Sequence, residues 1–431
     1  MSMLIIADDL SGAADCAIGF ASAGYRTVVT LDAVDTPAAD VIAADTDTRR
    51  LAPAEAGLRA AEVWQTLRAP GRRLYKKIDS TLRGNWAAEV AALQPLAGLA
   101  IVAPAFPATG RTVRDGRVLV HGEPLETTDT WQLENAGRPA ELRVLLAEAG
   151  LSSAHVDLHA LREGGDALAK RIAKIAADGT QALIVDTETR EDLLTLAQVT
   201  TQMAEPLFWV GSGGLAREMA SLPGWLDGKA RLEQPATAHA LHAMHATHAA
   251  HDAPVLVLVG SLSAVSERQC AMLRERAHVH ELIVPPAVLR QQERHADWQA
   301  WQARIAATLG ERHDLLLRIG RDDAFDAAEG ALLSTALAAL AQPHFAALGG
   351  LIATGGETAR AMLGAVGVGS LELLAEIEAG VAVGRPSGAN LPQHLRVVTK
   401  AGAFGTDHAL YAAWRYLREE AAAGAVAHDS I

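Results

Sequence analysis

The stretch MLIIADDLSGAAD, residues 3–15, joins a short apolar run to a polar turn and to the beginning of a helical pattern. The apolar run has the length and composition of a buried strand, and Asp8 and Asp9 stand where that strand should end. Ser11 and Gly12 follow at the start of the expected helix, which carries Asp15. A strand that leads through a turn into a helix is the repeating unit of α/β folds.

The alternation of strand-like and helix-like segments continues along the chain. A segment with a period near 3.6 residues, 52–69, separates two apolar runs of the first half. The alternation predicts an α/β protein with two α/β domains, each a mostly parallel sheet covered by helices, and an active site in the interdomain cleft. Further strand-like runs of the first half are 27–31, 41–45, 72–78, 99–105 and 182–187. Those of the second half are 254–261, 315–320, 347–355 and 395–402, with helical segments at 265–276 and 322–341.

Composition limits the classes of function. The 431 residues are 50% apolar, enough for two or three cores, and the net charge of -13 argues against a general affinity for nucleic acids or anionic membranes. Any bound anion therefore needs a local site. The two cysteines, Cys16 and Cys270, lie in apolar surroundings, and the first apolar run is too short for a signal peptide. We expect a cytoplasmic protein with buried thiols. Trp and Leu on surface helices leave a homodimer open.

Residues 230–253 lose the apolar periodicity and carry five histidines at intervals of three: His239, His242, His245, His248 and His251. A spacing of three drifts around a helix by about 60° per step, so the rings do not converge on one ion. No carboxylate or cysteine cluster completes a metal site there. We interpret the tract as a linker, with metal binding as the open alternative. The predicted domains are 1–229 and 254–431, joined by the linker 230–253.

Polar side chains follow three strands of the first half. Asp8 and Asp9 follow the first strand, ADTDTRR (44–50) ends another, and KKIDSTLRGN (76–85) ends a further one. A helix cap needs one oxygen and does not explain so many donors. Arg49 or Arg83 with Lys77 suits an anionic organic substrate, and aspartates accept hydrogen bonds from hydroxyls. These residues predict a site for a small polyhydroxy acid.

Glycine-rich turns follow three strands of the second half: VGSLS (259–263), ATGGETA (353–359) and KAGAFGTD (400–407). Each precedes a helix, where small residues let backbone N–H groups approach phosphate oxygens. Three such turns favour a nucleotide site. None matches G-x-x-x-x-G-K-[ST], and GSGGLA (211–216) does not form a dinucleotide fingerprint after a first strand. A Walker ATPase and a standard dehydrogenase are both disfavoured.

An ordered set of motifs resembles the four-carbon acid sugar kinase family over about residues 3–418. The motifs are IIADDLSGAAD, DTDTR, YKKIDSTLRGN, PAFPATGRT, GSGGLA, VLVGSLS, ATGGETARAML and KAGAFGTDHAL. The resemblance implies a sugar-acid-binding N-terminal domain, a nucleotide-binding C-terminal domain and ATP-dependent phosphorylation of the terminal (C4) hydroxyl of a four-carbon sugar acid. KKIDSTLRGN is similar to the branch that acts on threonate or erythronate, so D-threonate is the expected substrate. D-erythronate and 3-oxo-tetronate are the alternatives.

The family pattern also implies roles for individual residues. It assigns substrate contacts to Asp9, Arg49, Asp79, Ser80, Thr81, Leu82 and Arg83, beside Asp8 and Lys77 from the residue types. It assigns nucleotide contacts to Ser261, Gly355, Gly356, Glu357, Thr358 and Gly402. Trp86 departs from the pattern, where a smaller apolar residue is expected, and the histidine tract lies outside it.

The reaction calls for Mg²⁺, which would bridge the β- and γ-phosphates and use few protein oxygens, so no metal ligand is assigned. Two aspartates are candidates for the general base: Asp407, at the expected start of a helix, and Asp9, within the substrate site. A non-catalytic sugar-acid-binding protein would share the first site and need no second glycine-lined domain. Residue types do not decide the stereochemistry of the substrate.

Overall fold

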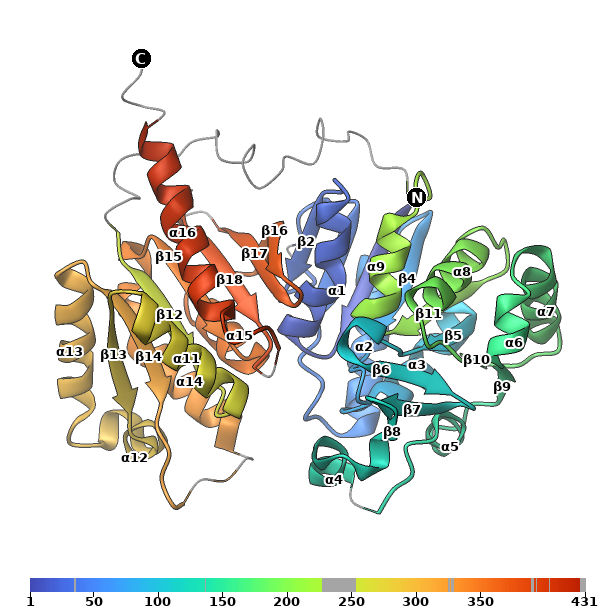
Figure 1. Cartoon of the computed structure of the whole chain (residues 1–431), viewed down its shortest axis with the longest axis horizontal. Coiled ribbons are helices and arrows are strands. Elements are labelled where there is room, and N and C mark those ends of the chain that lie inside the picture. Colours follow the sequence, from blue (N-terminus) through green and yellow to red (C-terminus); the bar gives the residue numbers. More distant parts are fainter. Residues whose placement is uncertain are drawn as a thin grey trace. The chain divides into compact units, whose positions relative to one another are not determined.

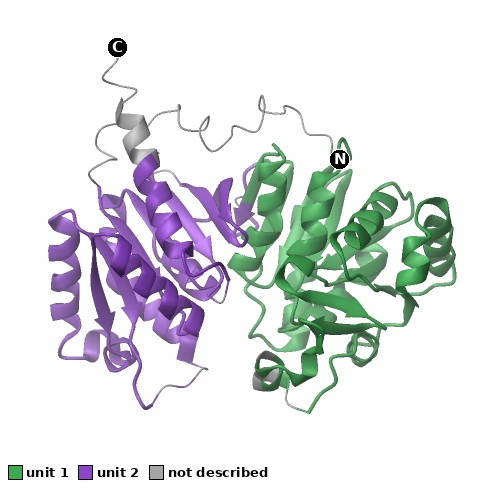
Figure 2. Ribbon diagram, viewed as in Figure 1, with its two compact units in different colours: residues 1–28, 38–231 green, residues 29–37, 232–431 purple. Residues whose placement is uncertain are grey.

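The computed structural model describes residues 1–34, 36–135, 137–226, 253–324, 326, 329–388, 391–392, 394–402 and 404–426 (Figure 1). The chain forms two compact units, Met1–Val28 with Ala38–Arg231, and Val29–Pro37 with Leu232–Ile431 (Figure 2). The histidine tract, and the predicted linker except Ala253, lie outside the described residues. Both units are α/β with mostly parallel sheets, as the sequence predicts. Within the described ranges, no helix has the length and apolar character needed to cross a membrane.

The sheet of unit 1 has the strand order β3-β1-β4-β11-β5-β10-β9, and every one of these neighbouring pairs is parallel. β1 is buried along almost its whole length, as expected for a parallel strand covered on both faces. These strands are β1 (Ser2–Ala7), β3 (Val41–Asp45), β4 (Arg72–Lys77), β5 (Leu99–Ala103), β9 (Ser153–Val156), β10 (Ala182–Val185) and β11 (Leu207–Gly211).

The helices of unit 1 pack in groups beside this sheet. One group joins α1, α9 and α8, and another joins α2 and α3. A small antiparallel sheet, β6-β7-β8, stands apart from the main sheet. The helices are α1 (Leu10–Ser22), α2 (Pro53–Leu67), α3 (Trp86–Ala97), α4 (Asp129–Asn135), α5 (Leu142–Glu148), α6 (Leu158–Arg162), α7 (Gly165–Ala177), α8 (Arg190–Thr201) and α9 (Gly213–Ser221). The small sheet consists of β6 (Arg111–Arg114), β7 (Arg117–Val120) and β8 (Glu123–Pro124).

Unit 2 has the strand order β13-β14-β12-β15-β18-β17-β16. The first five strands are parallel, and the last two add an antiparallel ladder. The strands are β12 (Val255–Val259), β13 (Val279–Val284), β14 (Asp314–Ile319), β15 (Gly350–Thr354), β16 (Ser370–Glu378), β17 (Val381–Ser387) and β18 (Arg396–Lys400). The helices are α11 (Ala264–Arg276), α12 (Pro286–Gln291), α13 (Trp298–Gly310), α14 (Gly330–Ala341), α15 (Gly356–Ala365) and α16 (Ala409–Val426).

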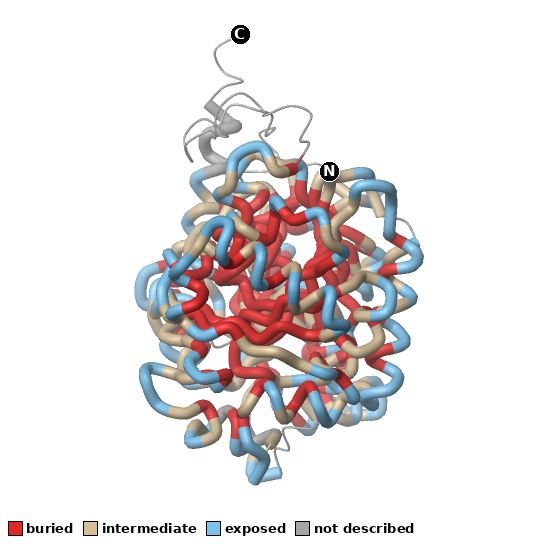
Figure 3. The backbone as a smooth tube through the Cα atoms, turned by 90° about the vertical axis from the view of Figure 1, so that its right-hand side faces the viewer, coloured by how far each residue is buried: buried red, intermediate tan, exposed pale blue. Residues whose placement is uncertain are grey.

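Each unit has its own apolar interior. Figure 3 looks at the chain from the right-hand side of Figure 1 and shows buried segments inside, with exposed segments around them. In unit 2, the strand residues Val257, Ile352 and Val398 pack against Leu273 of α11 and Leu410 of α16. One segment of the N-terminal half belongs to this unit: β2 (Thr27–Thr30) leads into residues 29–37, and the Leu31 N–H donates to the Gly369 carbonyl at 2.8 Å.

Both sheets contain a strand at which the winding of the chain reverses. β1 lies between β3 and β4 in unit 1, and β12 lies between β14 and β15 in unit 2. In open α/β sheets, ligands bind outside the carboxyl ends of the strands at such a point. The residues after β1 and after β12 are therefore the first places to look for ligand sites.

Candidate active site

Three strand ends of unit 1 bring the predicted acid-binding residues to one edge of the sheet. Ala7, the last residue of β1, pairs with Asp45 of β3 on one side and with Lys77 of β4 on the other. The loops that follow these strands carry Asp8 and Asp9, Arg49, and residues 78–83. The parallel register is the reason that segments far apart in sequence meet here.

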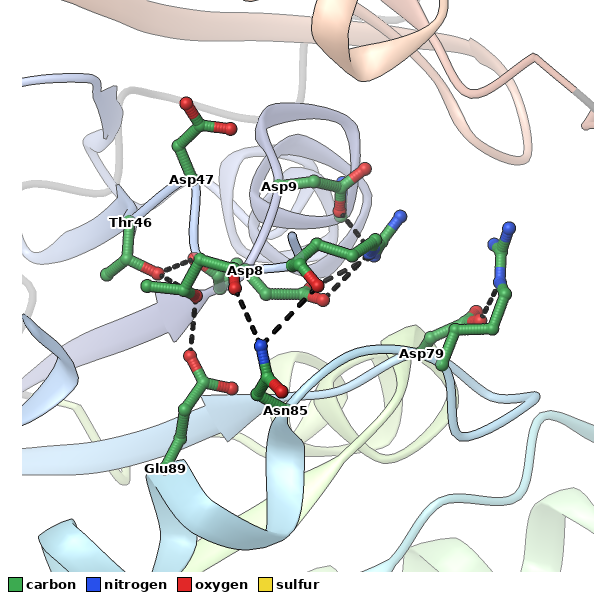
Figure 4. Close-up of polar contacts among 12 residues, drawn as sticks. Asp8, Asp9, Thr46, Asp47, Asp79, Asn85 and Glu89 are labelled. Atoms are coloured by element: carbon green, nitrogen blue, oxygen red, sulfur yellow. Dashed lines mark hydrogen bonds and ion pairs between the residues drawn. The ribbon is translucent and has the colours of Figure 1, made fainter. Parts of the chain in front are cut away.

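Arg49 joins the two aspartates that follow β1 (Figure 4). Its Nε and one terminal N–H group donate to the two carboxylate oxygens of Asp8 at 2.8 and 3.0 Å, and it also donates to Asp9 at 3.1 Å. Burial raises the pKa of Asp8, but the Arg49 charge and its hydrogen bonds outweigh burial, so the net pKa is lowered. Asp8 is therefore an ionised, oriented acceptor.

Asp9 also caps α1, because its carboxylate accepts the Gly12 N–H at 3.0 Å. The helix cap is therefore present, and the same carboxylate oxygen also accepts from Arg49, whereas the role of Asp9 in substrate binding stays a prediction. Its side chain stays 20% exposed, in contrast to 4% for Asp8. Asp9 is thus the more accessible of the two carboxylates.

The turn after β4 is built around Asp79. Its carboxylate accepts from the Thr81 hydroxyl at 2.6 Å and from Arg83 Nε at 2.5 Å. Burial alone would raise the pKa of Asp79. The charges of Arg83 and Arg49 outweigh burial, so the pKa of Asp79 lies well below its usual range. Leu82 has a φ of +58°, which is uncommon for a residue with a Cβ. Ser80, Thr81 and Leu82 are buried, so the turn is held in one conformation.

Lys77 is the cation at this edge that lacks a protein partner. Its side chain is buried, and its Nζ lies 3.1 Å from where a Cβ on Gly12 would stand. Among the described residues, no hydrogen bond or ion pair engages its ammonium group, although the charge acts on Asp8. A charge on a largely buried side chain is costly when it has no protein partner, and this is typical of a site that binds a counter-ion.

A group of residues behind the site, Lys76, Glu89 and Asn85, holds the loop that carries Arg49 in place. Lys76 and Glu89 form a buried ion pair at 2.9 Å, and Glu89 accepts from the Thr48 hydroxyl at 2.6 Å. Asn85 donates to the carbonyls of Thr48 and Leu51 at 3.0 and 2.8 Å. Several polar residues of KKIDSTLRGN therefore position the site and do not face a ligand.

Sequence reasoning missed Arg111, at the start of β6. Burial lowers the pKa of this arginine, whereas the Asp79 charge raises it, so its guanidinium lies within electrostatic reach of the Asp79 turn. The small β6-β7-β8 sheet thus brings a further cation to the site. Arg111 is the arginine of the motif PAFPATGRT, but no strand-like apolar run follows it to indicate that the segment forms a strand beside the site.

Three strand ends also meet in unit 2. Thr354 of β15 pairs with Val259 of β12 and with Lys400 of β18. The predicted nucleotide residues Ser261, Gly355–Thr358 and Gly402 follow these strands, so they lie at one edge of the sheet. The Thr358 hydroxyl lies 3.0 Å from that of Ser334 inside the unit, so its side chain has a structural role.

The glycines at this edge stand where a side chain would not fit. A Cβ on Gly402 would lie 2.5 Å from the Ser261 hydroxyl oxygen, and Gly355 has a φ of +99°. Gly355 is the N-cap of α15 and offers no side chain to cap the helix, while Glu357 lies in the first turn. Backbone N–H groups are therefore the donors here, as phosphate binding at a helix N-terminus requires. The residues present fit a nucleotide's phosphates.

Asp407 lies before α16 and pairs with Arg268 of α11 at 2.8 Å. Both side chains are about half exposed, at 47% and 55%. Its proposed role as general base stays a prediction. Within the described ranges, no group of three or more His, Cys, Asp or Glu side chains could hold a metal ion.

Comparison with known proteins covers nearly the whole chain. Residues 3–219 match a family described as a sugar-binding N-terminal domain, and residues 256–410 match a nucleotide-binding C-terminal domain. A D-threonate kinase from Cupriavidus necator is 53% identical over 99% of this chain and 100% of its own length. A D-threonate kinase from Bordetella bronchiseptica is 34% identical over 96% of this chain and 97% of its own. A solved structure from Salmonella typhimurium LT2 shares the fold, with a TM-score of 0.75, 22% identity, and coverage of 96% and 99%.

Proposed function

The chain belongs to the four-carbon acid sugar kinase family, and on that premise we propose that it transfers the terminal phosphoryl group of ATP to the C4 hydroxyl of D-threonate. The observation that carries the proposal is Lys77, a lysine 6% exposed whose ammonium group has no hydrogen-bond or ion-pair partner among the described residues and lies beside the Asp8, Asp9 and Arg49 cluster. The relatives from Cupriavidus necator and Bordetella bronchiseptica, both named D-threonate kinases, support the choice of acid.

The residues that follow β1, β3 and β4 in unit 1 are suited to bind a small hydroxylated molecule with one negative charge. A sugar-acid carboxylate would neutralise the Lys77 ammonium, and this contact would be strong because Lys77 is buried. The hydroxyls of the substrate need acceptors, and Asp8, Asp9 and Asp79 are held as oriented carboxylates by their arginine partners. An uncharged sugar would leave Lys77 without a counter-ion.

The glycine-rich turns that follow β12, β15 and β18 in unit 2 are suited to bind the phosphates of ATP. Backbone N–H groups around Gly355 and Gly402 would hold the phosphate oxygens, and Ser261, beside Gly402, would add a hydroxyl. Mg²⁺ bound with the nucleotide would neutralise charge between the β- and γ-phosphates. The described protein residues offer no dedicated acidic cage for it, so the phosphates and water would be its main ligands.

In the transfer step the protein mainly positions the two substrates, because the transition state of phosphoryl transfer is loose. Asp9 is exposed enough to accept a hydrogen bond from a substrate hydroxyl, and its contacts with Gly12 and Arg49 fix its orientation. We assign Asp9 to hydroxyl binding and keep Asp407 as the candidate base near the phosphates. An Asp407→Asn variant should then lose kcat without losing affinity for ATP.

The test is a coupled assay of ADP release with the full chain, ATP and Mg²⁺, across D-threonate, L-threonate, D-erythronate and 3-oxo-tetronates. We expect the highest kcat/KM with D-threonate, and a 4-phosphate product by ³¹P NMR and mass spectrometry. A preference for another four-carbon acid would correct the substrate and keep the reaction. Binding of the acid without ADP release would instead favour a non-catalytic sugar-acid-binding protein.

The cytoplasmic location and the homodimer stay predictions. Light scattering on the purified chain measures the oligomeric state directly, and fractionation of the source cells tests the location.

A further inference from the structure

Lys400 is the last residue of β18 and begins the glycine-rich turn KAGAFG. A lysine in such a turn is usually taken as a phosphate ligand. Here the side chain is 1% exposed. Its surroundings decide whether its charge can reach a phosphate.

The three N–H bonds of the Lys400 ammonium group all have partners. Lys400 Nζ donates to the carbonyl oxygens of Ala401, Gly402 and Phe404 at 2.8, 3.1 and 2.9 Å. An ammonium group has three donors and no acceptor, so none is left for a ligand. Direct contact with a phosphate would require one of these backbone bonds to break.

We propose, on the basis of the proposed nucleotide function, that Lys400 is a positioning residue that orients the amides of its turn toward the phosphates. The carbonyls of Ala401 and Phe404 point at Nζ. In a trans peptide, the N–H group points opposite to the carbonyl of the same unit. The N–H groups of Gly402 and Gly405 therefore point away from Lys400, and they supply the donors that an anion needs.

Other side chains reinforce the same arrangement. The hydroxyls of Ser263 and Ser266 donate to the Gly402 carbonyl at 3.2 and 2.8 Å. Gln269 donates to the Phe404 carbonyl at 3.1 Å. The carbonyls of the turn thus accept hydrogen bonds from one cation and from neutral side chains of α11 and its N-cap residue Ser263. Lys400 is the member of this set that can change its charge.

Lys400 titrates close to neutral pH. Burial lowers the pKa of Lys400 from 10.5 to about 8, against the opposing influence of Cys270 on α11 and Glu378 on β16. Burial raises the pKa of Cys270 to about 11, so its thiol stays protonated while Lys400 titrates. Above pH 8 the Lys400 side chain becomes a neutral amine, which has one donor fewer and no charge. The three hydrogen bonds that it donates to the carbonyls of the turn can then no longer all form.

The sign of the effect differs between ligand binding and stability. ATP binding needs the ammonium form, which is about one tenth populated at pH 9, so the apparent Kd for ATP should rise about tenfold between pH 7 and pH 9. Stability should respond in the opposite sense. Between pH 8 and 10.5 the unfolded chain holds a proton that the folded chain has released, so the Lys400 contribution to the free energy of unfolding increases with pH.

The experiment measures ATP and D-threonate binding by calorimetry at pH 7, 8 and 9, for the wild type, Lys400→Met and the exposed-lysine control Lys174→Met. We expect the wild type and the control to lose ATP affinity about tenfold by pH 9 with D-threonate binding unchanged. Lys400→Met should bind ATP at least tenfold more weakly at pH 7, with no further pH dependence.

A flat wild-type profile for ATP would overturn the proposal even if Lys400→Met fails to fold. Wild-type-like ATP binding by a folded Lys400→Met would overturn it as well. No ATP binding by the wild type at pH 7 would contradict the proposed function, and the inference would fail with it.

Discussion

Lys76 and Lys77 are adjacent on β4, but their side chains lie in different surroundings because neighbouring residues of a strand point to opposite faces of the sheet. Lys76 reaches Glu89 of α3, whereas Lys77 lies against Gly12 at the start of α1. The first lysine is neutralised inside the protein by Glu89, and we propose that the second is neutralised by the carboxylate of the substrate. This difference separates a structural residue from a binding residue.

Substitution of the two lysines by methionine should therefore give opposite results. Lys77→Met removes the counter-charge of the substrate and should weaken D-threonate binding at least about 30-fold, with ATP binding and stability retained. Lys76→Met leaves the buried Glu89 carboxylate without its counter-ion, with only the Thr48 hydroxyl as a partner, and should destabilise unit 1 by about 3–5 kcal/mol. Calorimetric titration and thermal unfolding measure both. A folded Lys77→Met that binds D-threonate normally would contradict the assignment.

The sequence predicts which residues meet at the site but not how they divide their tasks. Asp8, Arg49 and Asp79 follow buried strands, and the parallel sheet brings these strand ends together, so the residue set could be predicted. The pairing of Lys76 with Glu89 could not, because it depends on the face of β4 that α3 covers. Nor does the sequence show that the ammonium group of Lys400 donates to carbonyls of its own turn, because this depends on how the turn folds around the side chain.

At the scale of elements, most of the predicted strands are continuous apolar runs, although the apolar strand β11, LFWVG, was not predicted. β1 and β3 were predicted in this way because burial on both faces leaves few polar positions. β4 was also predicted, although its sequence RRLYKK carries four charged residues. β16 alternates apolar and polar residues along SLELLAEIE and is half-buried, and it was not predicted. The short strand β6, RTVR, has little apolar content and forms through pairing with β7 and through bridges to Phe106 and Thr187. Arg111 was missed because β6 was missed.

The turn after β18 gives a prediction about glycine. Gly402→Ala would place a Cβ 2.5 Å from the Ser261 hydroxyl oxygen, so one of the two residues must move and the phosphate donors shift. We expect ATP affinity to fall about tenfold or more, with D-threonate affinity unchanged. Gly364→Ala, in α15 with open space around its Cβ, is the matched control and should stabilise the protein by about 0.5–1 kcal/mol. Equal ATP affinities for the two variants would exclude a phosphate site at Gly402.

At the scale of the whole molecule, the two compact units each have a buried core, and we propose that each binds one of the two substrates. A ligand stabilises the unit that it binds, by about 2.7 kcal/mol at a concentration of 100 Kd. For units of this size, such a gain raises the unfolding temperature by about 5–10 °C. Each of the two substrates should therefore raise the unfolding temperature of a different unit.

Differential scanning calorimetry of the full chain tests this division. D-threonate should raise the transition of unit 1, and a non-hydrolysable ATP analogue with Mg²⁺ should raise that of unit 2. Lys77→Met should lose the first shift and keep the second, while Gly402→Ala should do the reverse. Each variant then serves as the control for the other, because each must keep one of the two shifts to count as folded. If one ligand moved both transitions equally, or if one substitution removed both shifts from a folded protein, the assignment of acid and nucleotide to different units would be wrong.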